Sequence, residues 1–134
     1  MEERRNHFQR LSVALSGLLL CGGAAGCELP PGVRVESGRI SISYRTVPAS
    51  IEVGKPFVLE LAVCDGIKYW ADAGRVRLDA HMPEHRHGMN YRVKVVPLAE
   101  GRYRSEGWLF HMPGRWEFVF DLGGEQLTHS VRIE

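Results

Sequence analysis

Two short windows of this sequence concentrate side chains that bind soft metal ions. They are HMPEHRHGM, residues 81–89, and HM, residues 111–112. Together they contain four histidines and three methionines: His81, Met82, His85, His87, Met89, His111 and Met112. Imidazole nitrogen and thioether sulfur together suit copper, above all Cu(I), whereas Zn²⁺ ordinarily recruits thiolate or carboxylate ligands as well. The two windows therefore predict a copper site.

The metal prediction rests most firmly on the loop residues of the first window. His85, His87 and Met89 lie in a loop bounded by proline and glycine, where two histidines have no core to fill. His111 brings a further imidazole from the second window, and a strand end or bulge there would let it share a face with Met112. Met112 is also in phase with apolar neighbours, so the alternative to metal binding is that its side chain packs in the core.

For the other candidate residues, a structural role explains the pattern at least as well as metal binding does. Met82 alternates with apolar residues and is equally well explained as a core side chain. His81 is out of phase with that set, which predicts a surface position near the site and makes it a weaker ligand candidate. His129 is in phase with apolar neighbours, as a hydrogen-bonded core histidine would be, and Cys64 is expected to be buried as a small apolar side chain.

The elements that position these residues are predicted to be β-strands. Apolar and polar residues alternate in seven runs separated by turn residues. These runs cover residues 40–44, 57–63, 76–82, 91–95, 103–112, 116–122 and 127–133. Seven short strands predict an all-β fold, an immunoglobulin-like antiparallel β-sandwich, although the Cys-Trp-Cys hallmark of antibody domains is absent.

Residues 1–26 are predicted to be a lipoprotein signal peptide. Three arginines precede an apolar stretch at residues 11–20, and the small residues GGAAG lead directly to Cys27. This order resembles the lipobox of bacterial lipoproteins, in which the cysteine receives diacylglyceryl and becomes the new N-terminus. Ala24 stands where a lipobox usually has leucine. An ordinary secretory signal cut near Ala25 stays open, as does an uncleaved anchor, although roughly 20 apolar residues are needed to span a bilayer.

Cleavage before Cys27 leaves 108 residues, enough for one domain. Residues 27–38 contain two prolines and no apolar period, which predicts a linker, and residues 39–134 form the predicted domain. The exported part has 14 basic and 14 acidic residues and no charge block, so nucleic acid is not an expected partner. Lipidation of Cys27 would leave Cys64 unpaired, and that form could hold no intramolecular disulfide.

The two metal-binding windows also resemble the YtkA-like family, which is related to FixH. The resemblance is carried by MPEHRHGMNY at residues 82–91 and GRYRSEGWLFHMPGRWEF at residues 101–118. The matching positions are Met82, Pro83, His85, His87, Gly88, Met89, Gly101, Tyr103, Met112, Gly114 and Trp116. The resemblance implies an immunoglobulin-like domain at the extracytoplasmic face, with copper handling or cytochrome-oxidase assembly as its role. FixH-type members carry an N-terminal membrane helix where this chain has a lipoprotein signal, so the assembly role does not carry over directly.

These observations predict a copper-binding lipoprotein on the periplasmic side of a bacterial membrane. It would accept, store or deliver Cu(I), with a copper-receiving or respiratory membrane protein as partner. The alternative is a metal-free β-sandwich interaction module that assists a membrane or respiratory complex. The sequence shows no Ser-His-Asp order, paired-carboxylate signature or glycine-rich phosphate loop, so an enzyme is not expected, and a copper redox enzyme is the weakest of the three classes.

Overall fold

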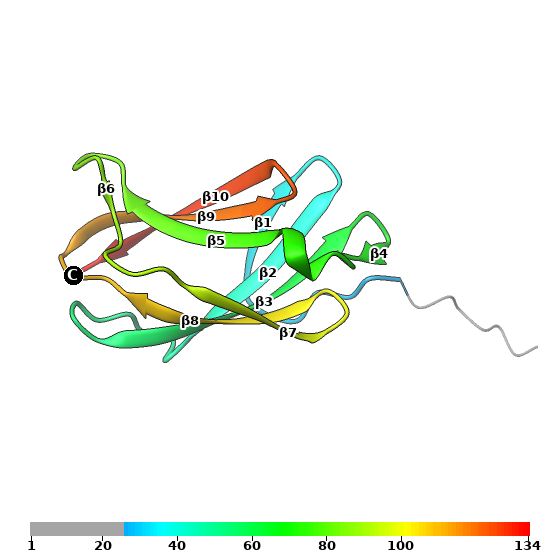
Figure 1. The fold of residues 1–134 in the computed structure, drawn as a ribbon, viewed down its shortest axis with the longest axis horizontal. Helices are drawn as coiled ribbons and strands as arrows, with labels where there is room; N and C mark the ends of the chain where they lie inside the picture. Colours follow the sequence, from blue (N-terminus) through cyan, green and yellow to red (C-terminus); the bar gives the residue numbers. More distant parts are fainter. Residues whose placement is uncertain (1–25) are drawn as a thin grey trace, which may run out of the picture.

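The computed structural model describes residues 26–134 as two antiparallel β-sheets packed face to face (Figure 1). The first sheet has the order β1 (Val33–Ser37), β2 (Ile40–Val47), β3 (Pro56–Asp65), β8 (Arg102–Leu109), β7 (Lys94–Ala99), with β4 (Lys68–Tyr69) paired to β3. The second sheet has the order β10 (Glu125–Ile133), β9 (Gly114–Leu122), β5 (Val76–Met82), β6 (His87–Gly88). A short 3₁₀ turn, η1 (Ala73–Arg75), precedes β5.

The strand order is that of an immunoglobulin-like sandwich. β2, β3, β8 and β7 correspond to the A-B-E-D sheet of that fold, and β10, β9 and β5 correspond to the G-F-C sheet. The predicted all-β fold is therefore confirmed. The described chain has ten strands instead of seven, because β1, β4 and β6 are short and mostly exposed and so carry no alternating apolar face.

Apolar alternation buries one face of each long strand between the two sheets. In β5 and β9 every second residue is buried, as the sequence period predicts. Trp116 lies completely buried in β9 and stacks on Phe110, with ring centroids 4.3 Å apart and an interplanar angle of 8°. This pair closes the core at the end of the sandwich where the histidine windows lie.

Two predicted strands have different boundaries in the structure. The run at residues 91–95 is not a strand from its start, because Tyr91 is 56% exposed and β7 begins at Lys94. Residues 89–93 instead connect β6 in one sheet to β7 in the other. The run at residues 103–112 ends as a strand at Leu109, because the chain then crosses to β9 in the opposite sheet.

The segment predicted as a linker, residues 27–38, packs onto the domain. Its second half forms β1, which pairs with β2 from Val33 opposite Tyr44 to Ser37 opposite Ile40. The turn between these strands contains Gly38 in the left-handed region at a φ of 55°, which glycine adopts without steric cost. The domain boundary therefore lies before residue 39. Nearly all of the predicted signal peptide, residues 1–25, lies outside the described residues.

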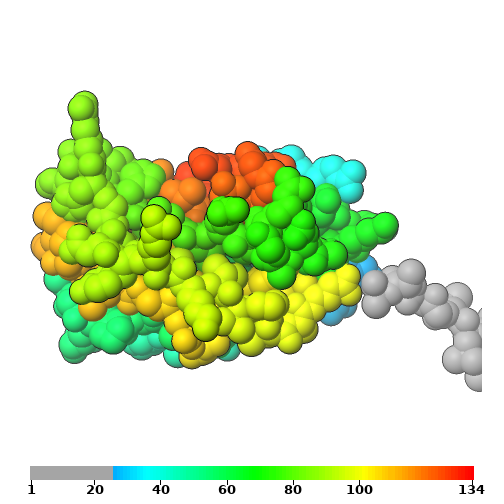
Figure 2. Space-filling view, viewed as in Figure 1, coloured from blue at the N-terminus to red at the C-terminus, as the bar shows by residue number. Residues whose placement is uncertain are grey.

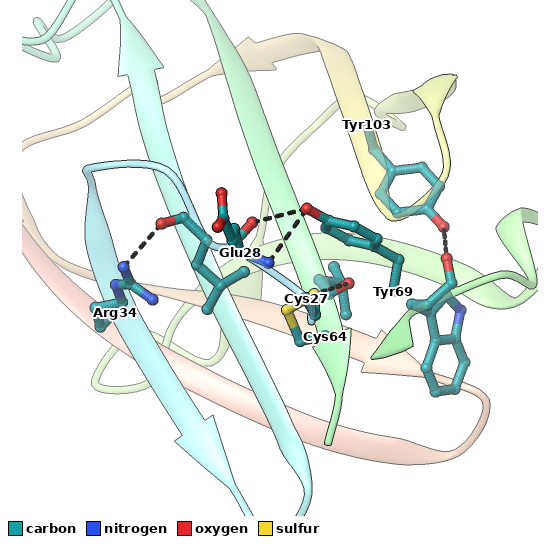
Figure 3. The surroundings of a disulfide bond; sticks show 9 residues. Cys27, Glu28, Arg34, Cys64, Tyr69 and Tyr103 are labelled. Atoms are coloured by element: carbon teal, nitrogen blue, oxygen red, sulfur yellow. Dashed lines mark hydrogen bonds between the residues drawn. A yellow bond between two sulfur atoms is a disulfide. The ribbon is translucent and has the colours of Figure 1, made fainter. Parts of the chain in front are cut away.

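The first half of the same segment is held by a disulfide between Cys27 and Cys64 (Figure 3). The two Cα atoms are 5.8 Å apart, and the backbone N–H of Cys27 donates a hydrogen bond of 2.8 Å to the Ile67 carbonyl. Cys64 is 3% exposed, so its predicted burial is confirmed. Cys64 is paired in this structure because the N-terminal segment folds back and brings Cys27 to it, so the structure describes a state other than the unpaired one expected for a lipidated Cys27.

We predict that removing this disulfide destabilises the domain by about 2–4 kcal/mol. It closes a loop between residues 37 apart, and such a cross-link removes conformational entropy from the unfolded chain. Urea unfolding of the purified oxidised protein should be compared with that of Cys27→Ser/Cys64→Ser. The wild-type protein under reductant is the control and should approach the double variant. Equal unfolding midpoints for oxidised wild type and double variant would contradict the prediction.

Candidate metal centre

The loop between β5 and β6 and the connection between β8 and β9 lie at the same end of the sandwich (Figure 1). They meet there because β5 pairs with β9, with Ala80 opposite Phe118 and His81 opposite Glu117. In the space-filling view the β5–β6 segment projects from this end of the molecule (Figure 2). The two sequence windows are therefore brought together by strand pairing.

The β5–β6 loop has a defined hairpin geometry. Met82 pairs with His87, and the backbone N–H of His85 donates a hydrogen bond of 3.2 Å to the Met82 carbonyl. Arg86 occupies the left-handed region at a φ of 54°, which is uncommon for a residue with a Cβ atom. This turn sets His85 and His87 beside each other, with ring centroids 5.9 Å apart.

Three imidazoles form a row that we call the histidine row: His85, His87 and His111. The rings of His87 and His111 have centroids 5.2 Å apart, and both neighbouring pairs of the row are inclined by 29°. The buried ring of Trp116 borders the row, and its centroid lies 5.5 Å from that of His111 and 6.2 Å from that of His87. His87 is thus the central member, and three predicted ligands are brought together.

The side chain of His87 contains the one buried side-chain nitrogen or oxygen atom without a hydrogen-bond partner in the described part of the chain. Its Nε2 is buried and has no hydrogen-bond partner there. A buried polar atom without a partner loses its hydration and gains nothing in return, so such atoms are uncommon in folded proteins. A bound ion or an ordered water would satisfy this nitrogen.

The charged side chains around the row are engaged with one another. His81 Nε2 lies 3.5 Å from Oε1 of Glu117, and Arg115 Nη1 lies 3.7 Å from Oε2 of the same carboxylate. The Arg115 guanidinium donates a hydrogen bond of 2.7 Å to Glu84 and thereby lowers the pKa of that carboxyl. His81 therefore lies near the surface beside the ion pairs of Arg115, as its phase in β5 predicted, and is not a member of the row itself.

The three methionines occupy different environments. Met82 is completely buried in the core, and a Cβ atom placed on Gly114 would lie 2.8 Å from its methyl carbon. These contacts support the core interpretation of Met82. Met112 is partly buried, and its carbonyl accepts a hydrogen bond of 3.0 Å from the indole of Trp116. Met89 lines an open groove with residues of β5 and of the β6–β7 connection.

The histidine row is not a closed coordination shell. Within residues 26–134, no group of three His, Cys, Asp or Glu side chains is arranged to hold a metal ion. The rings lie side by side with centroid spacings of 5.2 and 5.9 Å, and a shared metal would need one nitrogen of each ring about 2 Å from one point. The side chains of His85 and His111 are exposed, so solvent reaches the row from outside.

His129 is in the structural environment that its phase predicted. Its Nδ1 shares a hydrogen bond of 2.7 Å with the Tyr44 hydroxyl, and the two rings pack edge to face at 5.7 Å. Burial raises the pKa of Tyr44 to about 12. This pair is a satisfied polar contact at the edge of the core, separate from the histidine row.

Comparison with known proteins shows similarity to parts of two enzymes. Acyl-coenzyme A thioesterase 1 of Rattus norvegicus is 41% identical over 73 residues, which is 54% of this chain and 16% of the thioesterase. Acyl-coenzyme A thioesterase 5 of Mus musculus is 38% identical over 87 residues, 61% of this chain and 19% of that protein. The chain thus spans less than a fifth of the curated relatives it matches. No family model matches the chain, and no solved structure matches it.

Within the part of the chain that the structure describes, no helix is long and apolar enough to cross a membrane.

We predict that ionisation of the Tyr44 hydroxyl lowers the free energy of unfolding at alkaline pH. Its pKa is about 12 in the folded state and about 10 in an unfolded chain, so the folded state holds this proton more tightly. The stabilisation is fully present below pH 10 and is lost as the pH rises through 12. Urea unfolding across this range should show a falling free energy of unfolding, with a shallower fall in Tyr44→Phe. The matched control, Tyr91→Phe, changes an exposed tyrosine and should keep the wild-type slope; an unaltered slope in Tyr44→Phe would refute this assignment.

Proposed function

We propose that this chain is an extracytoplasmic copper-binding module that takes up Cu(I) at the histidine row. The observation that carries the proposal is the buried Nε2 of His87, which has no partner within the described residues and belongs to a ring flanked by two further imidazoles. A soft cation bound there would supply the missing interaction. The module would hold the copper ion and pass it on without catalysing a reaction.

His87 and His111 are the primary ligands in this proposal. Their rings are the closest pair of the row, and both border Trp116. Met112 is the preferred thioether, because it follows His111 directly and its carbonyl is bonded to the same tryptophan. Imidazole with thioether favours Cu(I) over Zn²⁺, since the nearby carboxylates of Glu84 and Glu117 are already engaged by Arg115.

The openness of the row favours acceptance and delivery over long-term storage. His85 and His111 are exposed, His87 is half-buried, and the β5–β6 loop projects from the molecule (Figure 2). Structural metal sites are closed by four protein ligands, whereas sites that exchange a ligand keep an open position. A membrane protein that receives copper could approach this exposed end directly.

We also propose a periplasmic location with membrane attachment through lipid on Cys27. The support is the lipobox-like sequence before Cys27, together with the partial resemblance of the histidine windows to the YtkA-like family. The Cys27 end and the histidine row lie at opposite ends of the sandwich (Figure 1). On an anchored chain this arrangement directs the row away from the lipid.

A second candidate is a metal-free interaction module, and the absence of a preformed three-residue group within residues 26–134 favours it. In that case the β5–β6 loop would contact the partner through its own surface.

The partial thioesterase similarity raises a third class of function, an acyl-coenzyme A hydrolase. A hydrolase of that kind needs a nucleophile next to a base, and the hydrogen-bonded serines among residues 26–134 contact other groups than histidine. We therefore expect no hydrolysis of acyl-coenzyme A by this chain.

We predict that the purified protein binds Cu(I) near neutral pH and that His87→Ala weakens binding at least about tenfold, or about 1.4 kcal/mol. The reason is that His87 is the central ring and carries the orphaned nitrogen. The measurement is a competition titration against a Cu(I) chelator, with Trp116 emission as a second signal because its ring borders the row.

The matched control is His129→Gln, which changes a histidine outside the row and should keep wild-type affinity. Circular dichroism on each variant separates loss of binding from loss of fold. If the wild-type protein does not compete for Cu(I), or if His87→Ala binds as tightly as wild type, the copper proposal fails and the interaction module takes its place.

We further predict that Met112→Leu lowers Cu(I) affinity more than Met89→Leu. Leucine preserves the volume and apolar character of methionine while removing the sulfur, so the packing of both sites should survive. Met112 is adjacent to the row, whereas Met89 lines the groove beside β5. The same titration measures both variants, and a larger loss in Met89→Leu would reassign the thioether ligand.

A further inference from the structure

We propose that Cys64 competes with lipid for Cys27, so that the chain exists in an anchored form and an unanchored, disulfide-closed form. The proposal rests on the proposed lipidation of Cys27 and does not depend on copper. It arises because the residue whose sequence context resembles a lipobox is the residue that the structure joins to Cys64. One sulfur atom cannot make both bonds.

The disulfide-closed form is supported by contacts along the whole N-terminal segment (Figure 3). The Cys27 N–H is bonded to the Ile67 carbonyl, and the Tyr69 hydroxyl accepts a hydrogen bond of 3.2 Å from the Glu28 N–H. The Ser43 hydroxyl donates a hydrogen bond of 2.6 Å to the Pro30 carbonyl. The segment is therefore held by hydrogen bonds to β2, to β4 and to the turn between β3 and β4, which would place the Cys27 thiol beside Cys64 before the disulfide forms.

The two outcomes use the Cys27 thiol in different reactions. In anchoring, Cys27 Sγ attacks the glyceryl carbon of a phospholipid, the carbon–oxygen bond to its phosphate breaks, and the thiol proton leaves with the released headgroup. In closure, the Cys27 thiolate attacks a disulfide of an oxidising thiol-disulfide exchange protein. The Cys64 thiolate then attacks Cys27 Sγ, which forms the Cys27–Cys64 bond and releases the exchange protein as a dithiol.

Each form has a defined consequence for the chain. The anchored form keeps Cys64 as a buried thiol in β3 and leaves the N-terminal segment attached to the domain by hydrogen bonds alone. The closed form has no sulfur available for lipid and is released from the membrane once the signal is cut near Ala25. The lipoprotein interpretation and the secretory interpretation of the signal therefore each correspond to a state of Cys27.

The test expresses the full chain in a bacterial host that processes lipoproteins and separates membranes from the soluble periplasm. Intact mass of each fraction, with and without reductant, identifies lipid on Cys27 or a disulfide that gains two hydrogens on reduction. The variants are Cys64→Ala and Cys27→Ser. Wild-type protein from cells grown with a thiol reductant provides a measurement that needs no substitution, in case Cys64→Ala does not fold.

We expect wild type to contain a soluble, lipid-free, disulfide-bonded form, and Cys64→Ala or reductant to shift the chain to the lipidated membrane fraction. Cys27→Ser should be soluble under every condition. Complete lipidation of wild type would overturn the proposal, because Cys64 would then offer no competition. Absence of lipid from both Cys64→Ala and reductant-grown wild type would overturn it too, because Cys27 would then serve the disulfide alone.

Discussion

The pairing of β5 with β9 is the interaction on which the candidate metal centre depends. This register continues β5 into the projecting hairpin and starts β9 directly after the second histidine window. Two segments more than twenty residues apart in sequence thereby share one end of the sandwich. A shift of one residue would turn the side chains of β5 to the opposite face and separate His87 from the aromatic residues beneath it.

The aromatic core supports the same end. Phe110 and Trp116 stack across the crossing from β8 to β9, and the indole N–H of Trp116 is bonded to the Met112 carbonyl. This bond holds the connection that carries His111 against the core, while His87 packs over the same ring. A rigid base under exposed imidazoles suits a site that takes up and releases an ion, because only the outer side chains need to move.

The opposite end of the sandwich is organised by the N-terminal segment. Cys27, Pro30 and β1 all attach to the first sheet, so the chain has no free tether within the described residues when the disulfide is present. The histidine row and the attachment point are thus separated by the length of the domain (Figure 1). This separation would let the proposed lipid attachment and the proposed copper exchange operate without steric interference.

The alternation of apolar residues determined the fold class and the core of this protein, because burial of one strand face follows directly from a period of two. It also identified His129 as a hydrogen-bonded core histidine. The short strands, the disulfide and the grouping of the histidines are not encoded by this alternation, and only the tertiary structure decided them. The short strands β1, β4 and β6 have no long apolar face to recognise, and the disulfide depends on a chain reversal that brings Cys27 to β3. The presence of two cysteines among residues 27–134 was its only signal in the sequence. The grouping of the histidines and the burial of His87 Nε2 likewise depend on the register between β5 and β9, a long-range pairing that no local pattern specifies.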